Sequence, residues 1–270
     1  MNPLVGIFDS GVGGLSVLKA IRLRLPQTPL VYVADQAHVP YGPRPVEDVR
    51  ALACGIVRFL KRQGAGIIVV ACNTASAAAL HELRRLYPRL VFVGMEPAVK
   101  PAAIHTRSGV VGVLATQGTL RGKLYASVVE RFAHGRRVME DPCAGLVAEI
   151  EKGHLNGDRT RDILQRALAP MLASGADTIV LGCTHYPFVL PLIREIAGEG
   201  VQVIDPAPAI ARRVAHLLAH HQAVKSAGVG ALTLLTTGKP GLFQRMAGRF
   251  LESEVSCGTL AWRDMDLEFE

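Results

Sequence analysis

The sequence predicts an α/β fold of two similar three-layer lobes, each built on a mostly parallel sheet and related by pseudo-twofold symmetry around a shared cleft. Short apolar strands alternate with amphipathic helices through most of the 270 residues, which is typical of a parallel sheet covered by helices. Motifs of the first hundred residues return in the same order in the next hundred. A cysteine follows a buried strand in each half, at Cys72 and at Cys183.

Composition and charge limit the possible functions. With 49% hydrophobic and 20% charged residues the chain is globular, and no apolar run approaches the roughly 18 residues that span a bilayer. We therefore expect a cytoplasmic protein with no membrane partner. The net charge of +7 comes from Lys and Arg scattered along helices, which disfavours a nucleic-acid partner and suits a small anionic substrate. The five cysteines have no Cys-x-x-Cys spacing, so we predict reduced thiols and no metal site.

The first strand, at residues 5–8, runs into the glycine-rich loop Asp9-Ser10-Gly11-Val12-Gly13-Gly14 and then a helix. The loop has neither the Gly-x-Gly-x-x-Gly spacing of a dinucleotide site nor the Gly-Lys-Ser/Thr ending of a P-loop, which disfavours nucleotide binding. Two interpretations remain open. Asp9 or Ser10 caps the helix, or both residues face a site at the end of the strand.

The second strand, at residues 30–34, ends at Asp35 and precedes a proline-rich stretch over residues 38–45. Because this irregular loop leaves the carboxyl end of a strand, we expect it to cover a ligand. A helix follows from Pro45, and its Cys54 is predicted to be a core residue.

The third strand, at residues 67–70, leads into Cys72-Asn73-Thr74 and an alanine-rich helix. In open α/β sheets such a junction binds ligands, because strand ends converge there and the first amides of the helix are free to hold an anion. A fourth strand, at residues 90–93, completes the first half.

The second half repeats this alternation. Its strands are expected at residues 110–114, around residue 138, and at residues 178–181 and 201–204. Its main helices are expected at residues 120–132 and 163–172, the second capped by Asn156 or Asp158. Cys183-Thr184-His185 follows the third of these strands.

Five pairs of positions, spaced by 106 to 111 residues, relate the two halves. They are Gly6 and Gly112, Ser10 and Thr116, Asp35 and Asp141, Cys72-Asn73-Thr74 and Cys183-Thr184-His185, and Glu96-Pro97 and Asp205-Pro206. This order predicts two equivalent lobes whose strand ends, and hence both cysteines, meet at one cleft.

The C-terminal segment is expected to complete the first lobe. It offers a helix at residues 210–218, a strand at 232–235, a helix after Pro240 and a last strand near 255–262. The predicted division of the chain is therefore a first lobe of residues 1–97 and 208–270 and a second lobe of residues 98–207.

Two facing thiols suit proton transfer. A thiolate acts as a base or nucleophile when a cation, a helix N-terminus or hydrogen bonds lower its pKa, and both cysteines are predicted to lie at helix N-termini. If they approach a substrate carbon from opposite sides, one removes a proton and the other delivers one, which inverts a stereocentre. Cys143 and Cys257 are interpreted as structural.

The motifs together resemble the glutamate racemases of the cofactor-independent aspartate/glutamate racemase superfamily. They are Phe8-Asp9-Ser10-Gly11-Val12-Gly13-Gly14, Val39-Pro40-Tyr41-Gly42, Ala71-Cys72-Asn73-Thr74-Ala75, Gly182-Cys183-Thr184-His185-Tyr186 and Ile204-Asp205-Pro206. The resemblance implies interconversion of L- and D-glutamate without pyridoxal phosphate or metal, for peptidoglycan synthesis, and makes a homodimer the expected assembly.

The resemblance also implies residue roles. Cys183 would deprotonate L-glutamate with help from His185, and Cys72 would deprotonate D-glutamate with help from Asp9. Glu151 matches the family's further acid, although the segment before it departs from the usual pattern, and a solvated helix acid is the alternative. The implied substrate-binding residues are Asp9, Ser10, Tyr41, Gly42, Asn73, Thr74, Thr184 and His185.

Two other functions remain open from the sequence. One is a sister enzyme that acts on aspartate or another amino acid, and the other is a catalytically silent protein that binds acidic amino acids. A binding protein has no evident need for two opposed thiols.

Overall fold

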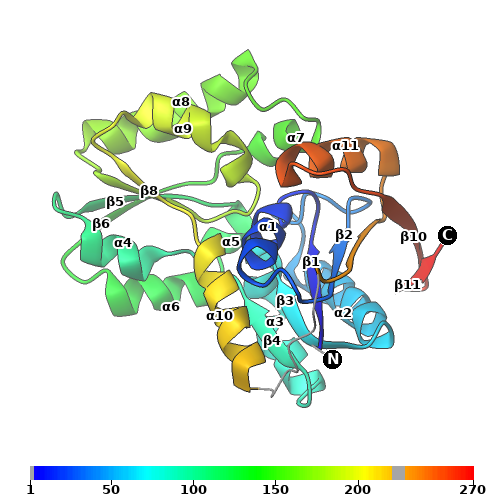
Figure 1. Cartoon of the computed structure of the whole chain (residues 1–270). Helices are drawn as coiled ribbons and strands as arrows, with labels where there is room; N and C mark the ends of the chain where they lie inside the picture. Colours follow the sequence, from blue (N-terminus) through cyan, green and yellow to red (C-terminus); the bar gives the residue numbers. More distant parts are fainter. Residues whose placement is uncertain (1–2, 221–228) are drawn as a thin grey trace.

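The computed structural model describes residues 3–220 and 229–270, and it contains two α/β lobes side by side (Figure 1). The α/β class with mostly parallel sheets is confirmed. The larger sheet belongs to the first lobe and has the strand order β11-β10-β9-β2-β1-β3-β4. Its strands are β1 (Leu4–Asp9), β2 (Leu30–Ala34), β3 (Ala65–Val70), β4 (Val91–Gly94), β9 (Leu232–Thr236), β10 (Cys257–Arg263) and β11 (Asp266–Phe269).

Helices cover both faces of this sheet, because its central strands are apolar on both sides. In β1, Val5 and Ile7 belong to one buried cluster and Phe8 to another. The first face carries α1 (Leu15–Arg24), α10 (Ala207–His220) and α11 (Pro240–Leu251). The second face carries α2 (Val46–Arg62) and α3 (Asn73–Leu86).

The second lobe is built on the parallel sheet β6-β5-β7-β8. Its strands are β5 (Val110–Leu114), β6 (Arg137–Asp141), β7 (Thr178–Leu181) and β8 (Gln202–Ile204). One face is covered by α4 (Val99–His105) and α6 (Lys123–Phe132), with the short α5 (Gln117–Leu120) beside them. The other face is covered by α7 (Leu146–Glu151), α8 (Asp158–Ala173), the 3-10 helix η1 (Tyr186–Val189) and α9 (Leu190–Ala197).

The strand order of the second sheet repeats the centre of the first. The order β2-β1-β3-β4 corresponds to β6-β5-β7-β8, so the strands that precede Cys72 and Cys183 occupy equivalent places. Strands β9 to β11 extend the first sheet beyond β2. The division of the chain at residues 97/98 and 207/208 stays a prediction, because strand pairing does not define those boundaries.

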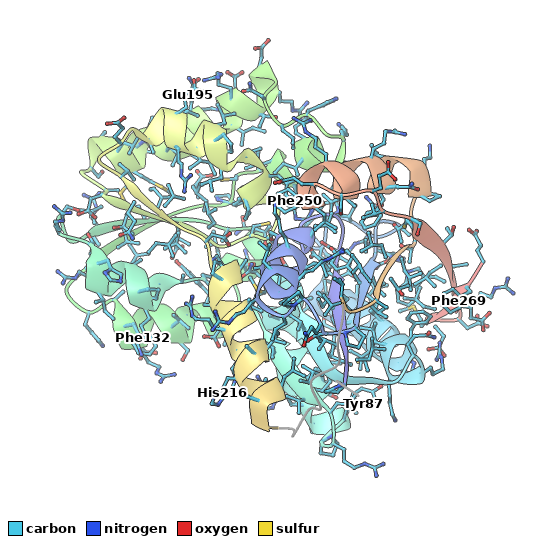
Figure 2. The ribbon with its side chains drawn as sticks, viewed as in Figure 1. Tyr87, Phe132, Glu195, His216, Phe250 and Phe269 are labelled. Carbon is cyan, nitrogen blue, oxygen red and sulfur yellow. The ribbon has the colours of Figure 1, made fainter. Side chains whose placement is uncertain are left out.

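One of the apolar clusters extends across both lobes. A single buried cluster contains Val5 of β1 together with Leu146 and Ile193 of the second lobe. At its edge Phe250 of α11 stacks on Phe188 of η1, with ring centroids 4.0 Å apart, and Figure 2 shows Phe250 at the junction of the lobes. The position of one lobe is therefore coupled to that of the other by packing.

Three local predictions were wrong. The expected helix over residues 120–132 is divided into α5 and α6 at Gly122, which is the N-cap of α6. The N-cap of α8 is Gly157 rather than Asn156 or Asp158. The last strand, β10, is followed by the unpredicted β11, paired with it in antiparallel fashion. The turn between them has two residues with positive φ, Asp264 and Met265, without the glycine that usually marks such turns.

Candidate active site

The carboxyl ends of the central strands surround a cavity between the lobes with an empty volume of about 270 Å³. Its lining residues are Ser10, Pro40, Tyr41, Gly42, Cys72, Asn73 and Thr74 from the first lobe, and Thr116, Val147, Cys183, Thr184 and His185 from the second. Both predicted thiols therefore line one cavity, each contributed by a different lobe.

Cys72 is the N-cap residue of α3. Its Sγ accepts a hydrogen bond from the Ala75 N–H at 3.4 Å, and the residue is 5% exposed. Burial, and after it the charge of Asp9, raises the pKa of the Cys72 thiol well above its ordinary value. This shift favours the thiol form of Cys72, which is the form that donates a proton.

Asp9 lies at the end of β1 and is fully buried. Its carboxylate accepts from the backbone N–H of Ser10 at 2.7 Å, from the N–H of Gly14, and from the Thr184 hydroxyl at 3.1 Å. Burial raises the pKa of Asp9, against the lowering effect of the charge on His185. Gly14 is the N-cap of α1, so neither Asp9 nor Ser10 is its capping residue. The hydrogen bond to Thr184 joins Asp9 to the second lobe.

Cys183 is paired with a histidine that is itself held by an acid. Cys183 Sγ lies 3.7 Å from His185 Nδ1, and His185 Nε2 lies 2.6 Å from Glu151 Oε1. Burial alone lowers the pKa of His185, but contacts with Cys183 and Glu151 outweigh it and raise that pKa well above its ordinary value. A protonated imidazole beside a sulfur atom stabilises the thiolate.

The interpretation of Glu151 as a solvated helix acid was wrong. Its side chain is 10% exposed, and besides His185 it accepts from the Val12 N–H at 2.7 Å and from Gln36 Nε2 at 2.8 Å. The glycines of the loop after β1 make this approach possible, because a Cβ on Gly11 would collide with the Glu151 carboxylate.

The two thiols differ in their relation to helices. Cys72 lies at the N-terminus of α3, as predicted. Contrary to the prediction, Cys183 does not directly precede an α-helix, because the 3-10 helix η1 follows it, with His185 as the N-cap. A four-residue 3-10 helix offers few free amides, and the His185 imidazole lies 3.7 Å from the Cys183 sulfur.

Among the predicted binding residues, Asn73 has the most open hydrogen-bonding capacity. It is buried, and neither its Oδ1 nor its Nδ2 has a hydrogen-bond partner among the residues that the structure describes. Buried amide groups are almost always paired, so Asn73 is suited to a polar ligand in the cavity. Tyr41 also lines the cavity, but its hydroxyl donates to Asp35 at 2.6 Å.

Thr116 is a lining residue that sequence reasoning did not include in the site. Its hydroxyl lies 2.8 Å from that of Thr74, across the two lobes. The signal was present in the repeat, where Thr116 corresponds to Ser10. Pro40 and Val147 were missed as well, and nothing in the chemistry of Val147 distinguishes it from a core residue.

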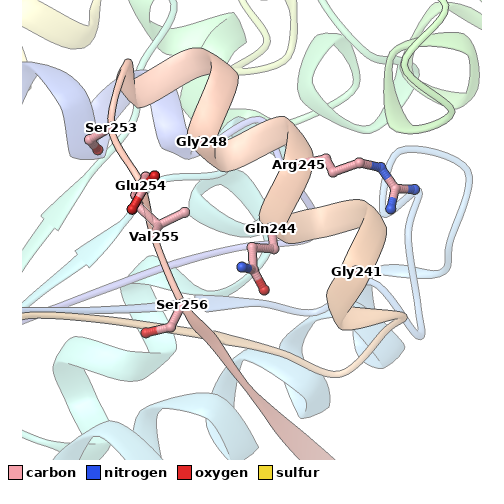
Figure 3. Close-up of a pocket in the computed structure, with 8 residues that line it drawn as sticks. All are labelled: Gly241, Gln244, Arg245, Gly248, Ser253, Glu254, Val255 and Ser256. Atoms are coloured by element: carbon pink, nitrogen blue, oxygen red, sulfur yellow. The ribbon is translucent and has the colours of Figure 1, made fainter.

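The surface holds a larger recess that lacks the chemistry of this cavity. It lies between α11 and residues 253–256, as Figure 3 shows, and has an empty volume of about 1300 Å³. It is lined by Gly241, Gln244, Arg245, Gly248, Ser253, Glu254, Val255 and Ser256. None of these described lining residues carries a thiol or an imidazole, in contrast to the cavity between the lobes.

All five cysteines are free thiols. Within residues 3–220 and 229–270, no group of three or more His, Cys, Asp or Glu side chains is arranged to hold a metal ion. In the same ranges no helix is both long and apolar enough to cross a bilayer.

Comparison with known proteins gives a consistent result. A family model described as Asp/Glu/Hydantoin racemase matches residues 15–214. A glutamate racemase of Roseiflexus sp. is 49% identical over 247 residues, which cover 91% of each chain.

Solved structures agree with this match. The glutamate racemase isoform RacE1 of Bacillus anthracis is 30% identical with a TM-score of 0.86, and the match covers 98% of each chain. The Escherichia coli glutamate racemase, solved with L-glutamate and the activator UDP-MurNAc-ala, is 34% identical with a TM-score of 0.84, over 97% of this chain and 99% of that one. The chain therefore belongs to the Asp/Glu/hydantoin racemase family, among its glutamate racemases.

Proposed function

We propose that the chain interconverts L- and D-glutamate by proton transfer between the substrate and two thiols. The observation that carries this proposal is that Cys72 and Cys183, from equivalent strands of the two lobes, line the same small cavity. Each thiol then faces a different side of one bound carbon atom, as a two-base inversion requires.

The reaction is balanced by two proton transfers. With L-glutamate, the Cys183 thiolate takes the α-proton and becomes a thiol, while the Cys72 thiol gives its proton to the opposite face of the same carbon and becomes a thiolate. D-glutamate is converted by the reverse steps. The assignment of each cysteine to one enantiomer rests on the motif resemblance, and exchange with solvent after product release restores the starting protonation.

The neighbouring groups support the two thiols differently. His185, held by Glu151, provides a positive charge beside Cys183. The fully buried Asp9 instead raises the pKa of Cys72, which favours the thiol form. Substrate carboxylates are expected to bind the hydroxyl and amide groups of Ser10, Asn73, Thr74 and Thr184. Such groups at the start of a helix suit an anion, and α3 begins at Asn73.

The similarity to glutamate racemases supports a proposal for the biological role. The Escherichia coli relative was solved with L-glutamate, which supports glutamate as the substrate. We propose that the enzyme is cytoplasmic, works as a homodimer without a cofactor, and supplies D-glutamate for peptidoglycan.

The proposal is tested with purified protein in deuterium oxide, without added cofactor, starting from each enantiomer of glutamate. Optical rotation reports inversion, and nuclear magnetic resonance reports α-deuterium. We expect inversion with deuterium uptake, lost in Cys72→Ala and in Cys183→Ala but retained in Cys54→Ala, a half-buried thiol on α2 outside the cavity.

Other outcomes have distinct meanings. Faster turnover of aspartate than of glutamate would identify the sister activity. Binding of glutamate without inversion or exchange in the wild type would replace the racemase by a binding protein.

A further inference from the structure

Asp35, the residue that follows β2, is a buried carboxylate that the proposed mechanism does not use. It is 0% exposed and accepts hydrogen bonds from four side chains. The donors are Tyr41 Oη at 2.6 Å, Trp262 Nε1 at 2.7 Å, Thr237 Oγ1 at 2.8 Å and His38 Nδ1 at 3.0 Å. A buried charge with this many donors holds their positions, because moving any of them leaves it underpaired.

Two of the donors belong to the loop that covers the cavity, residues 36–45, here called the covering loop. Its Pro40, Tyr41 and Gly42 line the cavity. Gly42 lies against the second lobe, where a Cβ on it would come within 3.0 Å of Thr116 Cβ. A hydrogen bond within the loop also restrains its shape, since Arg44 Nε donates to the His38 carbonyl at 2.6 Å. A small shift of this loop therefore changes the shape of the cavity.

The other two donors come from the C-terminal part of the chain, beyond the residues 15–214 that match the family. Thr237 follows β9, and Trp262 lies on β10. The indole ring is fixed on two sides. It packs on α2 at Gly55, where a Cβ would lie 2.6 Å from the ring, and the edge of the His38 ring meets it at a centroid distance of 5.4 Å.

We propose that Asp35 is a positioning residue, which fixes Tyr41 and the covering loop over the substrate cavity, and that Trp262 and Thr237 of the C-terminal segment fix Asp35 in turn. The inference rests on the proposed function, because glutamate turnover is its readout. Among the described residues that line the cavity, Tyr41 is the one with a hydrogen bond to Asp35, so loss of Asp35 alters substrate binding more than proton transfer.

The test compares Asp35→Asn and Trp262→Phe with the wild type. The second variant removes the indole N–H, keeps an aromatic ring, and lies outside the cavity. The expected result is a rise in KM for glutamate of about tenfold in Asp35→Asn, as for one lost bond to a charged group, with kcat changed less than about threefold. Trp262→Phe is expected to raise KM as well. In the double variant the rise in KM should be smaller than the product of the two single effects, because both substitutions act through one carboxylate.

Two variants of the second lobe serve as matched controls. Asp177→Asn changes a carboxylate that also accepts from several donors, including Thr106 Oγ1 at 2.6 Å and the Ser108 N–H at 2.8 Å. Tyr125→Phe removes a hydroxyl that donates to Glu140 at 2.7 Å. Neither site lines the cavity, so these variants are expected to alter the melting temperature and leave KM unchanged.

The outcomes separate the inference from the proposed function. If Asp35→Asn and Trp262→Phe lower the melting temperature like Asp177→Asn but keep the wild-type KM, Asp35 is only structural and the inference is overturned. A fall in kcat alone overturns it too. If Asp35→Asn does not fold, the KM values of Trp262→Phe and Thr237→Val test the inference, since both variants keep the Asp35 carboxylate. An inactive wild type would instead remove the proposed function.

Discussion

Replacing Glu151 by glutamine tests the most specific contact in the proposed mechanism. Glu151 Oε1 accepts from His185 Nε2 at 2.6 Å and from the Val12 N–H at 2.7 Å, and Oε2 accepts from Gln36 Nε2 at 2.8 Å. A glutamine keeps one accepting oxygen toward His185 but presents its own NH₂ group to the NH₂ group of Gln36. Turning the Gln36 amide relieves this conflict, because the Thr236 hydroxyl, which donates to Gln36 Oε1 at 2.9 Å, can accept from the amide nitrogen instead.

The expected size of the effect follows from the lost charge. The Glu151 carboxylate is one of the groups that raise the pKa of His185 above its ordinary value. A hydrogen bond to a charged group contributes about 1.5–3 kcal/mol, which corresponds to roughly 10- to 150-fold in kcat/KM. Because L- and D-glutamate have equal free energies in solution, kcat/KM must fall by the same factor in both directions.

Circular dichroism follows racemisation from each enantiomer. Glu149→Gln is the matched control, since it makes the same change on α7 at a carboxylate that pairs with His154 at 2.9 Å and Lys152 at 3.4 Å, away from the site. The control is expected to keep the wild-type kcat/KM. A Glu151→Gln enzyme within about twofold of the wild type, or equal losses in both variants, would refute the support of His185 by Glu151.

Three further predictions concern the loop after β1, the histidine and the junction of the lobes. Gly13→Ala places a methyl group against His185 Nδ1 and is expected to reduce kcat/KM at least 100-fold by displacing the imidazole, as measured in the same assay. The pKa of His185 is raised, so its stabilisation of the fold is complete below its ordinary value of 6.5 and is lost as the pH rises through the folded value. Melting temperatures should therefore decline with rising pH more steeply in the wild type than in His185→Asn. Phe250→Ala removes the half-buried ring stacked on Phe188 and should lower the free energy of unfolding in urea by about 1–3 kcal/mol.

The sequence was sufficient for the described strands other than β11, for the repeat and for the placement of both thiols in one cavity. Apolar strands bounded by glycine and polar residues are a local signal, and two equivalent sets of them constrain the arrangement of the whole chain. The site residues found in this way, such as Asn73 and Thr184, lie within one or two residues of a strand end or a cysteine.

Individual side-chain contacts between residues far apart in the chain could not be worked out from local patterns, although the resemblance implied a role for Glu151. Glu151 and Glu149 lie on the same short helix, and only the packing of α7 against the loop after β1 decides which of them meets His185. Asp35 accepts hydrogen bonds from Thr237 and Trp262, which lie about 200 residues away in the chain. No spacing rule relates such positions, because they belong to strands brought together by the sheet.

The repeat also explains why the two halves of the site are not identical. His185 corresponds to Thr74 in the aligned motifs, so Cys183 has an imidazole where Cys72 has a hydroxyl residue and a helix N-terminus. In the proposed mechanism this difference has a use. Burial raises the pKa of Cys72 and so favours an acid there, whereas His185, whose pKa is raised, places a positive charge beside Cys183. In that mechanism the asymmetry suits the conversion of L-glutamate, whereas D-glutamate is converted from the opposite protonation state, with a thiolate at Cys72 and a thiol at Cys183.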